Sequence, residues 1–130
     1  MTSPLTPSTP PQMTVSQRFF FDAAHTLERD IEAEGSRRIH GHTYHAEVSV
    51  RGPLNPQSGM VLDLGWLRQH LQAVREQLDH HLLDEVPDLG TPTLENLCLF
   101  IARQLAHVQP PLAQVRVWRD AVGDSCTLHL

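Results

Sequence analysis

The sequence predicts an α+β domain with the element order β-β-α-α-β-β. Apolar residues alternate with polar ones in four short segments, two near each end of the chain, as they do in half-buried strands. Between these pairs lie two segments whose apolar residues recur every three or four positions, as on one face of a helix. Strands joined without a helical crossover pair antiparallel, so we expect a four-stranded antiparallel sheet with both helices on one face.

The first strand pair is expected at residues 13–25 and in the segment that begins with His40. One face of the first segment carries five residues of odd number: Val15, Phe19, Phe21, Ala23 and His25. In the second segment four residues alternate with polar neighbours: Tyr44, Ala46, Val48 and Val50. The charged segment 28–38 between the two strands contains Gly35 and is predicted to be a loop.

The helices and the second strand pair follow in order. A helix from about residue 63 to residue 79 has the apolar stripe Leu64, Leu67, Leu71, Val74 and Leu78. The segment 91–95 (TPTLE) is typical of a helix N-terminus, and Pro110-Pro111 ends the helix that it starts. Strands are then expected from Val115 and from Cys126 onward. A four-stranded sheet has two unpaired edges, so we expect subunits to pair through them as a homo-oligomer.

Composition restricts the class of protein. The chain has 130 residues, of which 40% are hydrophobic and 19% charged, which fits a single packed domain over residues 13–130. Residues 1–12 hold four of the ten prolines and predict a flexible tail. The net charge of −5 argues against binding to nucleic acid or to anionic membranes. Without a long apolar run, a signal segment or a cysteine framework, a cytoplasmic protein is expected.

Three histidines form the main candidate site. His40 and His42 are two positions apart on one strand, so their side chains point to the same face. His25 ends the preceding strand and comes to lie opposite them if the two strands pair antiparallel. Three histidines and an open position are the ligand set of a catalytic zinc site. We therefore predict that Zn²⁺ binds here, against the alternative of three unrelated histidines.

A second group, Asp79-His80, is placed at the end of the first helix. An aspartate beside a histidine can orient the ring and support its protonated form, as in a general acid/base pair. A polar helix end at which a histidine complements the helix dipole is the equally weighted alternative.

The order of motifs resembles the family of 6-pyruvoyl-tetrahydropterin and 6-carboxytetrahydropterin synthases. The matching motifs span most of the chain: FDAAH (21–25), HGHTY (40–44), GMVLD (59–63), LDHHLLD (78–84) and PTLENL (92–97). The resemblance implies the tunnelling fold (T-fold), in which subunits join their sheets into a barrel, commonly as a hexamer. It also implies that His25, His40 and His42 bind Zn²⁺ and that Asp79 and His80 move protons. The implied substrate is 7,8-dihydroneopterin triphosphate, and the carboxy-forming branch supplies queuosine biosynthesis.

Two positions depart from the pattern of that family. The family has a catalytic cysteine four residues before the first histidine of HGH, and this chain has Ser36, a much weaker acid. Some relatives use a glutamate nearby, for which Glu32 and Glu34 are candidates.

The second departure is in the third strand. The family has a glutamate there that holds the amino-pyrimidine edge of the pterin, and the aligned residue here is Arg119, which only donates hydrogen bonds. Either a bulge turns the neighbouring Asp120 into the pocket, or the ligand differs. By position, Thr93 and Glu95 are further candidates for substrate binding.

Three hypotheses follow from these matches and departures. In the first, the chain is a zinc-dependent lyase of the 6-carboxytetrahydropterin synthase type, with Ser36 in the place of the usual base. In the second, the metal and the fold are kept but the pterin-like substrate has changed. In the third, the protein is an oligomer that binds zinc or a ligand without catalysis.

Overall fold

The computed structural model describes residues 10–130, and it confirms the predicted fold class and element order. The strands are β1 (Gln12–His25), β2 (His40–Pro53), β3 (Leu112–Arg119) and β4 (Asp124–His129), and the main helices are α2 (Leu64–Leu78) and α3 (Leu94–Gln104). Most of the predicted tail, residues 1–9, lies outside the described residues. The four strands form one antiparallel sheet in the order β1-β2-β3-β4.

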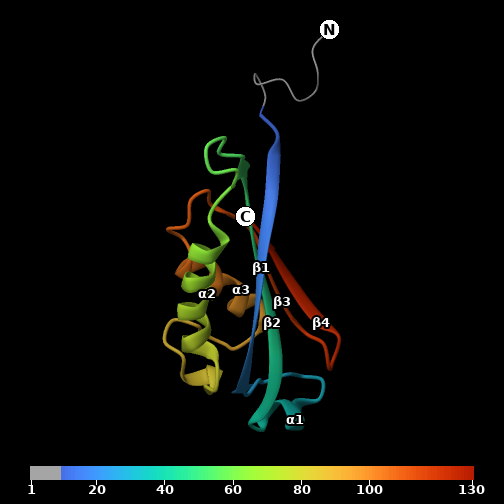
Figure 1. Ribbon diagram of the computed structural model, residues 1–130. Coiled ribbons are helices and arrows are strands. Elements are labelled where there is room, and N and C mark those ends of the chain that lie inside the picture. The colour runs from blue at the N-terminus through green and yellow to red at the C-terminus, as the bar shows by residue number, and fades with distance from the viewer. Residues whose placement is uncertain (1–9) are drawn as a thin grey trace.

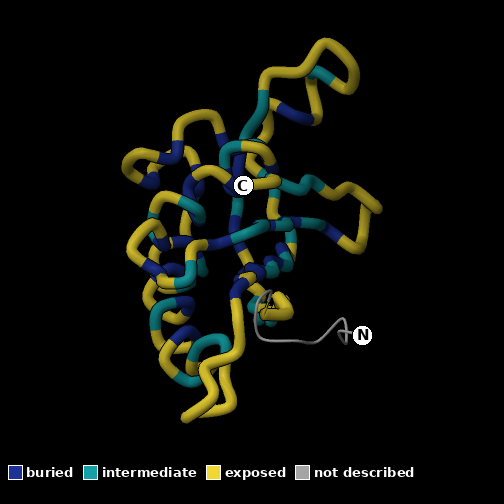
Figure 2. Tube along the Cα trace, turned by 90° about the horizontal axis from the view of Figure 1, so that it is seen from above, coloured by how far each residue is buried: buried dark blue, intermediate teal, exposed yellow. Residues whose placement is uncertain are grey.

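Both helices lie on one side of the sheet, as Figure 1 shows, and the core fills the space between these two layers. Figure 2 shows that the buried positions lie in the interior and the exposed ones mainly on the connecting loops. The apolar stripes predicted for the helices meet the inner face of the sheet, where Phe21, Tyr44 and Val117 are all buried. This burial of apolar area is the main driving force for the fold.

Capping side chains fix where the two helices begin. The Asp63 carboxylate accepts hydrogen bonds from the backbone N–H groups of Gly65 at 2.8 Å and Trp66 at 3.4 Å. The Thr93 hydroxyl accepts one from Asn96 N–H at 3.1 Å. Each cap satisfies backbone donors that have no partner inside the helix, so these two short polar residues set the helix starts.

The segment predicted as a loop between β1 and β2 contains a one-turn helix, α1 (Ala33–Arg37). It lies at the end of the sheet near the start of β2 (Figure 1). A 3₁₀ turn, η1 (Leu83–Glu85), was also not predicted. Elements of one turn bury too few apolar residues to show a helical period, so periodicity does not detect them.

The outer edge of β1 is partly covered by the chain that follows α2. Arg75 donates to the Phe20 carbonyl at 2.6 Å, and Ala24 N–H donates to the His81 carbonyl at 3.1 Å. Between them, His80 N–H donates to the Asp22 carbonyl at 2.7 Å. These bonds hold the end of α2 against the part of β1 that leads to His25.

Candidate metal centre and adjoining cavities

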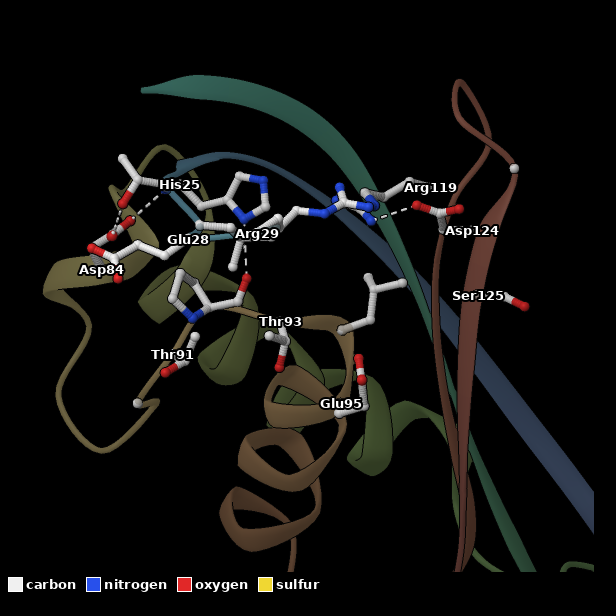
Figure 3. Close-up of a pocket in the computed structure, with 16 residues that line it drawn as sticks. His25, Glu28, Arg29, Asp84, Thr91, Thr93, Glu95, Arg119, Asp124 and Ser125 are labelled. Atoms are coloured by element: carbon white, nitrogen blue, oxygen red, sulfur yellow. Dashed lines mark hydrogen bonds and ion pairs between the residues drawn. The ribbon is translucent and has the colours of Figure 1, made fainter. Parts of the chain in front are cut away.

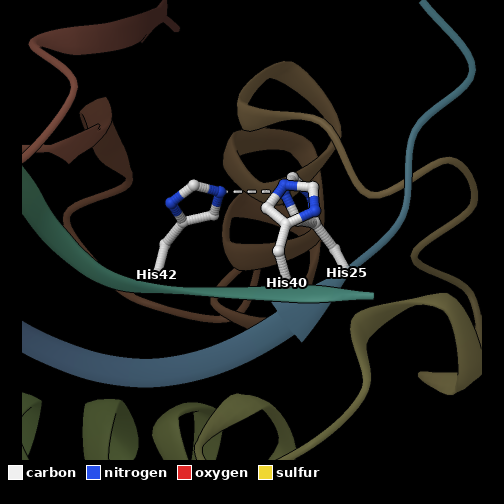
Figure 4. Close-up of side chains that lie close together, drawn as sticks. All are labelled: His25, His40 and His42. Carbon is white, nitrogen blue, oxygen red and sulfur yellow. Dashed lines mark hydrogen bonds between the residues drawn. The ribbon is translucent and has the colours of Figure 1, made fainter. Parts of the chain in front are cut away.

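The register of β1 and β2 brings the three histidines together. His25 pairs with His40 and Ala23 pairs with His42, so all three imidazoles emerge on the face that carries the helices. The Nε2 atom of His25 lies 2.9 Å from Nε2 of His40 and 3.0 Å from Nε2 of His42. Figure 4 shows the three rings turned toward one another above the end of β1.

Backbone carbonyls orient two of the three rings. His25 Nδ1–H donates to the Pro92 carbonyl at 3.0 Å, and His40 Nδ1–H donates to the Arg38 carbonyl at 2.8 Å. A neutral imidazole that carries its proton on Nδ1 presents a lone pair at Nε2. The Nε2 atoms of both rings therefore face each other as acceptors.

The charge state of the cluster agrees with this arrangement. Burial lowers the pKa of His25, although its hydrogen bond to Pro92 acts in the opposite direction. Burial and the nearby Arg119 guanidinium lower the pKa of His42 from 6.5 to about 4. Neutral rings with converging lone pairs repel one another unless a cation lies between them, and an all-nitrogen set of three suits Zn²⁺. The donor set therefore fits a zinc ion.

Two cavities meet at this cluster. The large cavity, of about 1150 Å³, is lined by His25, Thr93, Glu95 and Arg119 among others (Figure 3). The histidine cavity, of about 480 Å³, is lined by all three histidines, Ser36 and Arg119. Each of the predicted residues Thr93, Glu95, Ser36 and Arg119 thus shares a cavity with at least one candidate metal ligand, and Arg119 lines both cavities.

Arg119 is buried at the wall between the cavities, with 9% of its surface exposed. Its Nη2 donates to the Asp124 carboxylate at 2.7 Å, and its Nη1 lies 3.4 Å from His42 Nε2. The guanidinium carbon is 5.9 Å from the centre of the Tyr44 ring. Arg119 therefore brings a positive charge to the edge of the histidine cluster.

Asp120, predicted as a possible pocket residue, extends to the other face of the sheet. Strands β3 and β4 pair in unbroken register as far as Arg119 and Asp124, so no bulge turns Asp120 inward. Its side chain is 74% exposed, and its carboxylate lies 3.4 Å from His45 Nε2. Neighbouring strand residues face opposite ways, which explains why Arg119 points in and Asp120 points out.

Asp124 is the carboxylate that does line this wall, and sequence reasoning did not identify it. It is the cross-strand partner of Arg119 after the turn at residues 120–123. The signal was available in principle, because opposite charges that flank a tight hairpin turn often face each other across the strands. Tyr44 is buried in the core, and its ring also lies beneath the guanidinium of Arg119.

Ser36 is 5% exposed and is held by the backbone around α1. Its hydroxyl donates to the Ala33 carbonyl at 2.9 Å and accepts from Arg29 N–H at 3.3 Å. Of the two glutamates considered as substitutes for a thiol, Glu32 lines the histidine cavity. Glu34 is 87% exposed and pairs with Arg38 at 3.1 Å, so its carboxylate faces solvent.

Asp79 and His80 line neither the large cavity nor the histidine cavity. The Asp79 carboxylate accepts from Asp22 N–H at 2.9 Å and lies 3.7 Å from the His80 ring. His80 is 79% exposed and lines a third cavity of about 650 Å³, which His42 also lines. The predicted pair is therefore formed, but within this chain it lies apart from the residues that line the large cavity.

Comparison with known proteins identifies the family. A dihydroneopterin monophosphate aldolase from Pyrococcus furiosus is 33% identical over 104 residues, which cover 78% of this chain and 84% of that protein. A 6-carboxy-5,6,7,8-tetrahydropterin synthase from Synechocystis is 33% identical over 103 residues, which cover 75% of this chain and 78% of that protein.

A solved structure agrees with the same assignment. The Caenorhabditis elegans 6-pyruvoyl tetrahydropterin synthase matches with a TM-score of 0.79 and 27% identity, covering 93% of this chain and 97% of that one. This likeness confirms the predicted tunnelling fold. No helix within residues 10–130 is long and apolar enough to cross a membrane.

The model of the 6-pyruvoyl tetrahydropterin synthase family matches residues 14–128. The chain therefore belongs to this family, whose members are lyases of tetrahydropterin synthesis.

Proposed function

We propose that the protein is a zinc-dependent lyase that acts on the side chain of a dihydropterin phosphate. The observation that carries the proposal is the convergence of the Nε2 atoms of His40 and His42 on Nε2 of His25, at 2.9 and 3.0 Å, at the wall of a cavity. The leading candidate reaction converts 7,8-dihydroneopterin triphosphate and water into 6-carboxytetrahydropterin, acetaldehyde and triphosphate. A relative named for that product supports this choice, and the product would supply queuosine biosynthesis in the cytoplasm.

When bound, zinc supplies a Lewis acid that polarises oxygen atoms of the pterin side chain. The residues of this chain position the substrate and handle protons. Thr93 and Glu95 line the large cavity and offer hydrogen bonds to the ring. Ser36 and Glu32 line the histidine cavity, where a carboxylate can act as a base near neutral pH and a hydroxyl, which stays protonated, cannot.

The acid/base role of Asp79 and His80 requires a second copy of the chain. Neither residue lines the large cavity or the histidine cavity of its own chain. We therefore include a homo-oligomer, with a hexamer as the expected size, in which one subunit contributes the pair to the cavity of another. The edge of β4 and the part of the β1 edge before Phe20 are the surfaces that such pairing would use.

Mixed oligomers test this arrangement. We expect His42→Ala and His80→Ala each to abolish activity, and unfolding and refolding the two together to restore a fraction of it. Restoration is possible only if the two residues serve the same site from different subunits. If the mixture stays inactive although both variants fold and assemble into oligomers, the hypothesis of a site shared between subunits is wrong.

Product analysis tests the reaction. Zinc-loaded protein is incubated with 7,8-dihydroneopterin triphosphate, and acetaldehyde and free triphosphate are measured. His25→Ala should remove both zinc and activity, whereas His129→Ala, on the exposed end of β4, should change neither. Full zinc loading with no turnover of any reduced pterin would instead favour the non-catalytic alternative.

A second reaction is favoured by one observation, the hydroxyl of Ser36 at the place of a thiol. The relative from Pyrococcus furiosus is named as an aldolase. Aldol-type cleavage would break the bond between the first and second side-chain carbons and leave the phosphate on the aldehyde fragment. Detection of a phosphorylated aldehyde without free triphosphate would therefore replace the first reaction by the second.

A further inference from the structure

The guanidinium of Arg119 has more hydrogen-bond donors than the protein uses. An arginine has five N–H groups in a fixed planar arrangement. Asp124 accepts from Nη2, His42 Nε2 is within 3.4 Å of Nη1, and the buried Nε has no partner among residues 10–130. A metal bound at His42 Nε2 would occupy that lone pair and free Nη1. Two donors of Nη1 and one of Nη2 then remain without a protein acceptor on a residue that lines both cavities.

A ligand group that satisfies this wall must be rich in acceptors. The amino group and ring N–H of a pterin are donors, so Arg119 cannot hold that edge. A carboxylate or phosphate offers two coplanar oxygens that match the guanidinium, with charge-assisted hydrogen bonds. Asp124 does not neutralise the site completely, because its side chain is 50% exposed whereas that of Arg119 is 10% exposed.

We propose that Arg119 is an oxyanion-binding residue that selects ligands with a carboxylate or phosphate beside the three histidines. The inference deepens the proposed function and depends on it for the pterin class of the ligand. Asp124 is a positioning residue, since its carboxylate fixes the orientation of the guanidinium from the neighbouring strand (Figure 3).

Binding of two stable, fluorescent oxidised pterins tests the proposal without turnover. 6-Carboxypterin and 6-hydroxymethylpterin have similar size and differ in the charge of the side chain. We expect zinc-loaded protein to bind 6-carboxypterin about tenfold or more tightly, the preference that one charged hydrogen-bonded pair provides. In Arg119→Gln the ratio of the two affinities should fall to the value that attraction between zinc and the carboxylate alone produces. Arg116→Gln, on the outer face of the sheet against Trp118, is the matched control and should retain the full preference.

Asp124→Asn separates ligand binding from a purely structural role of the ion pair. The amide oxygen in this variant can still accept from Nη2 and orient the guanidinium, while the charge of Arg119 is less neutralised, so binding of 6-carboxypterin should stay equal or tighten. A structural ion pair would make Asp124→Asn and Arg119→Gln weaken binding alike. If Arg119→Gln does not fold, Arg119→Lys keeps the charge without the planar donors and should show an intermediate preference.

Three results would overturn the proposal: no preference in the native protein, the same preference in Arg119→Gln, or no binding of either pterin. Competition with inorganic triphosphate identifies the source of the oxyanion. If triphosphate displaces 6-carboxypterin from the native protein but not from Arg119→Gln, Arg119 binds the phosphate chain of the substrate. If triphosphate does not displace 6-carboxypterin from the native protein, Arg119 binds the carboxylate. If the protein prefers 6-carboxypterin but shows no catalytic turnover, the lyase proposal is refuted and the role of Arg119 stands. If it turns over its substrate but shows no such preference, the lyase proposal stands and the role of Arg119 is refuted.

Discussion

The histidine cluster should make the zinc-free protein sensitive to acid over a defined range of pH. Burial and the Arg119 guanidinium lower the pKa of His42 from 6.5 to about 4. In the unfolded chain the same ring titrates near 6.5. Between these two values the unfolded state binds a proton that the folded state does not, so stability falls as the pH falls from 6.5 toward 4.

The magnitude follows from the shift. Each pKa unit corresponds to about 1.36 kcal/mol, so His42 would cost the folded state about 2 kcal/mol between pH 7 and pH 5. Because the ring is only partly buried, solvent screening reduces this to about 1 to 2 kcal/mol. Burial of His25 shifts its pKa in the same direction and adds to the total loss.

Urea unfolding of the zinc-free protein at pH 7 and pH 5, at one fixed protein concentration, measures this effect. His42→Gln removes one titrating group from the cluster, so its free energy of unfolding should fall by about 1 to 2 kcal/mol less than that of the native protein. His129→Gln, at an exposed position, should fall as much as the native protein. Equal losses in all three proteins would show that His42 is not held neutral, and the argument for a converging set of lone pairs would fail.

Three further outcomes are expected. Tyr44→Phe should leave the free energy of unfolding unchanged or raise it by up to about 1 kcal/mol, since the buried hydroxyl has no partner among residues 10–130; urea titration checks this. Asp63→Ala should lower stability by about 1 kcal/mol through loss of the α2 cap without changing zinc content. Ser36→Cys should raise the rate of acetaldehyde release by about tenfold or more, because a thiol ionises far more readily; an unchanged rate would favour an altered reaction.

The sheet and its two helices could be predicted from sequence because each is long enough to show its period. Phe21, at an odd-numbered position of β1, and Tyr44, at an even-numbered position of β2, pair with each other and are both buried. The alternation of apolar and polar residues along each strand indicated this shared face. The same parity predicted that His25, His40 and His42 share a face. Placing the metal centre needed only the register of one strand pair, which the burial of one face of each strand specifies.

The surroundings of the cluster could not be predicted in the same way. The position of Asp124 depends on the length of the turn after Arg119, and Ser36 is brought over the histidines by a one-turn helix with no periodic signal. Asp79 and His80 are adjacent in sequence to a helix end that packs on the edge of β1. The sequence placed them at the end of the first helix, but only the structure shows that neither residue lines the histidine cavity.

The two departures from the family pattern act on the same cavity and in the same electrostatic direction. Ser36 and Arg119 both line the histidine cavity, where the resemblance implied a thiol and a carboxylate. One substitution removes a group that can become an anion, and the other replaces an anion by a cation, which Asp124 offsets only in part. Beside a divalent ion the combined change favours a ligand of greater negative charge. A single change at either position would be a local variation, whereas the pair together supports the proposal that Arg119 selects an anionic ligand group.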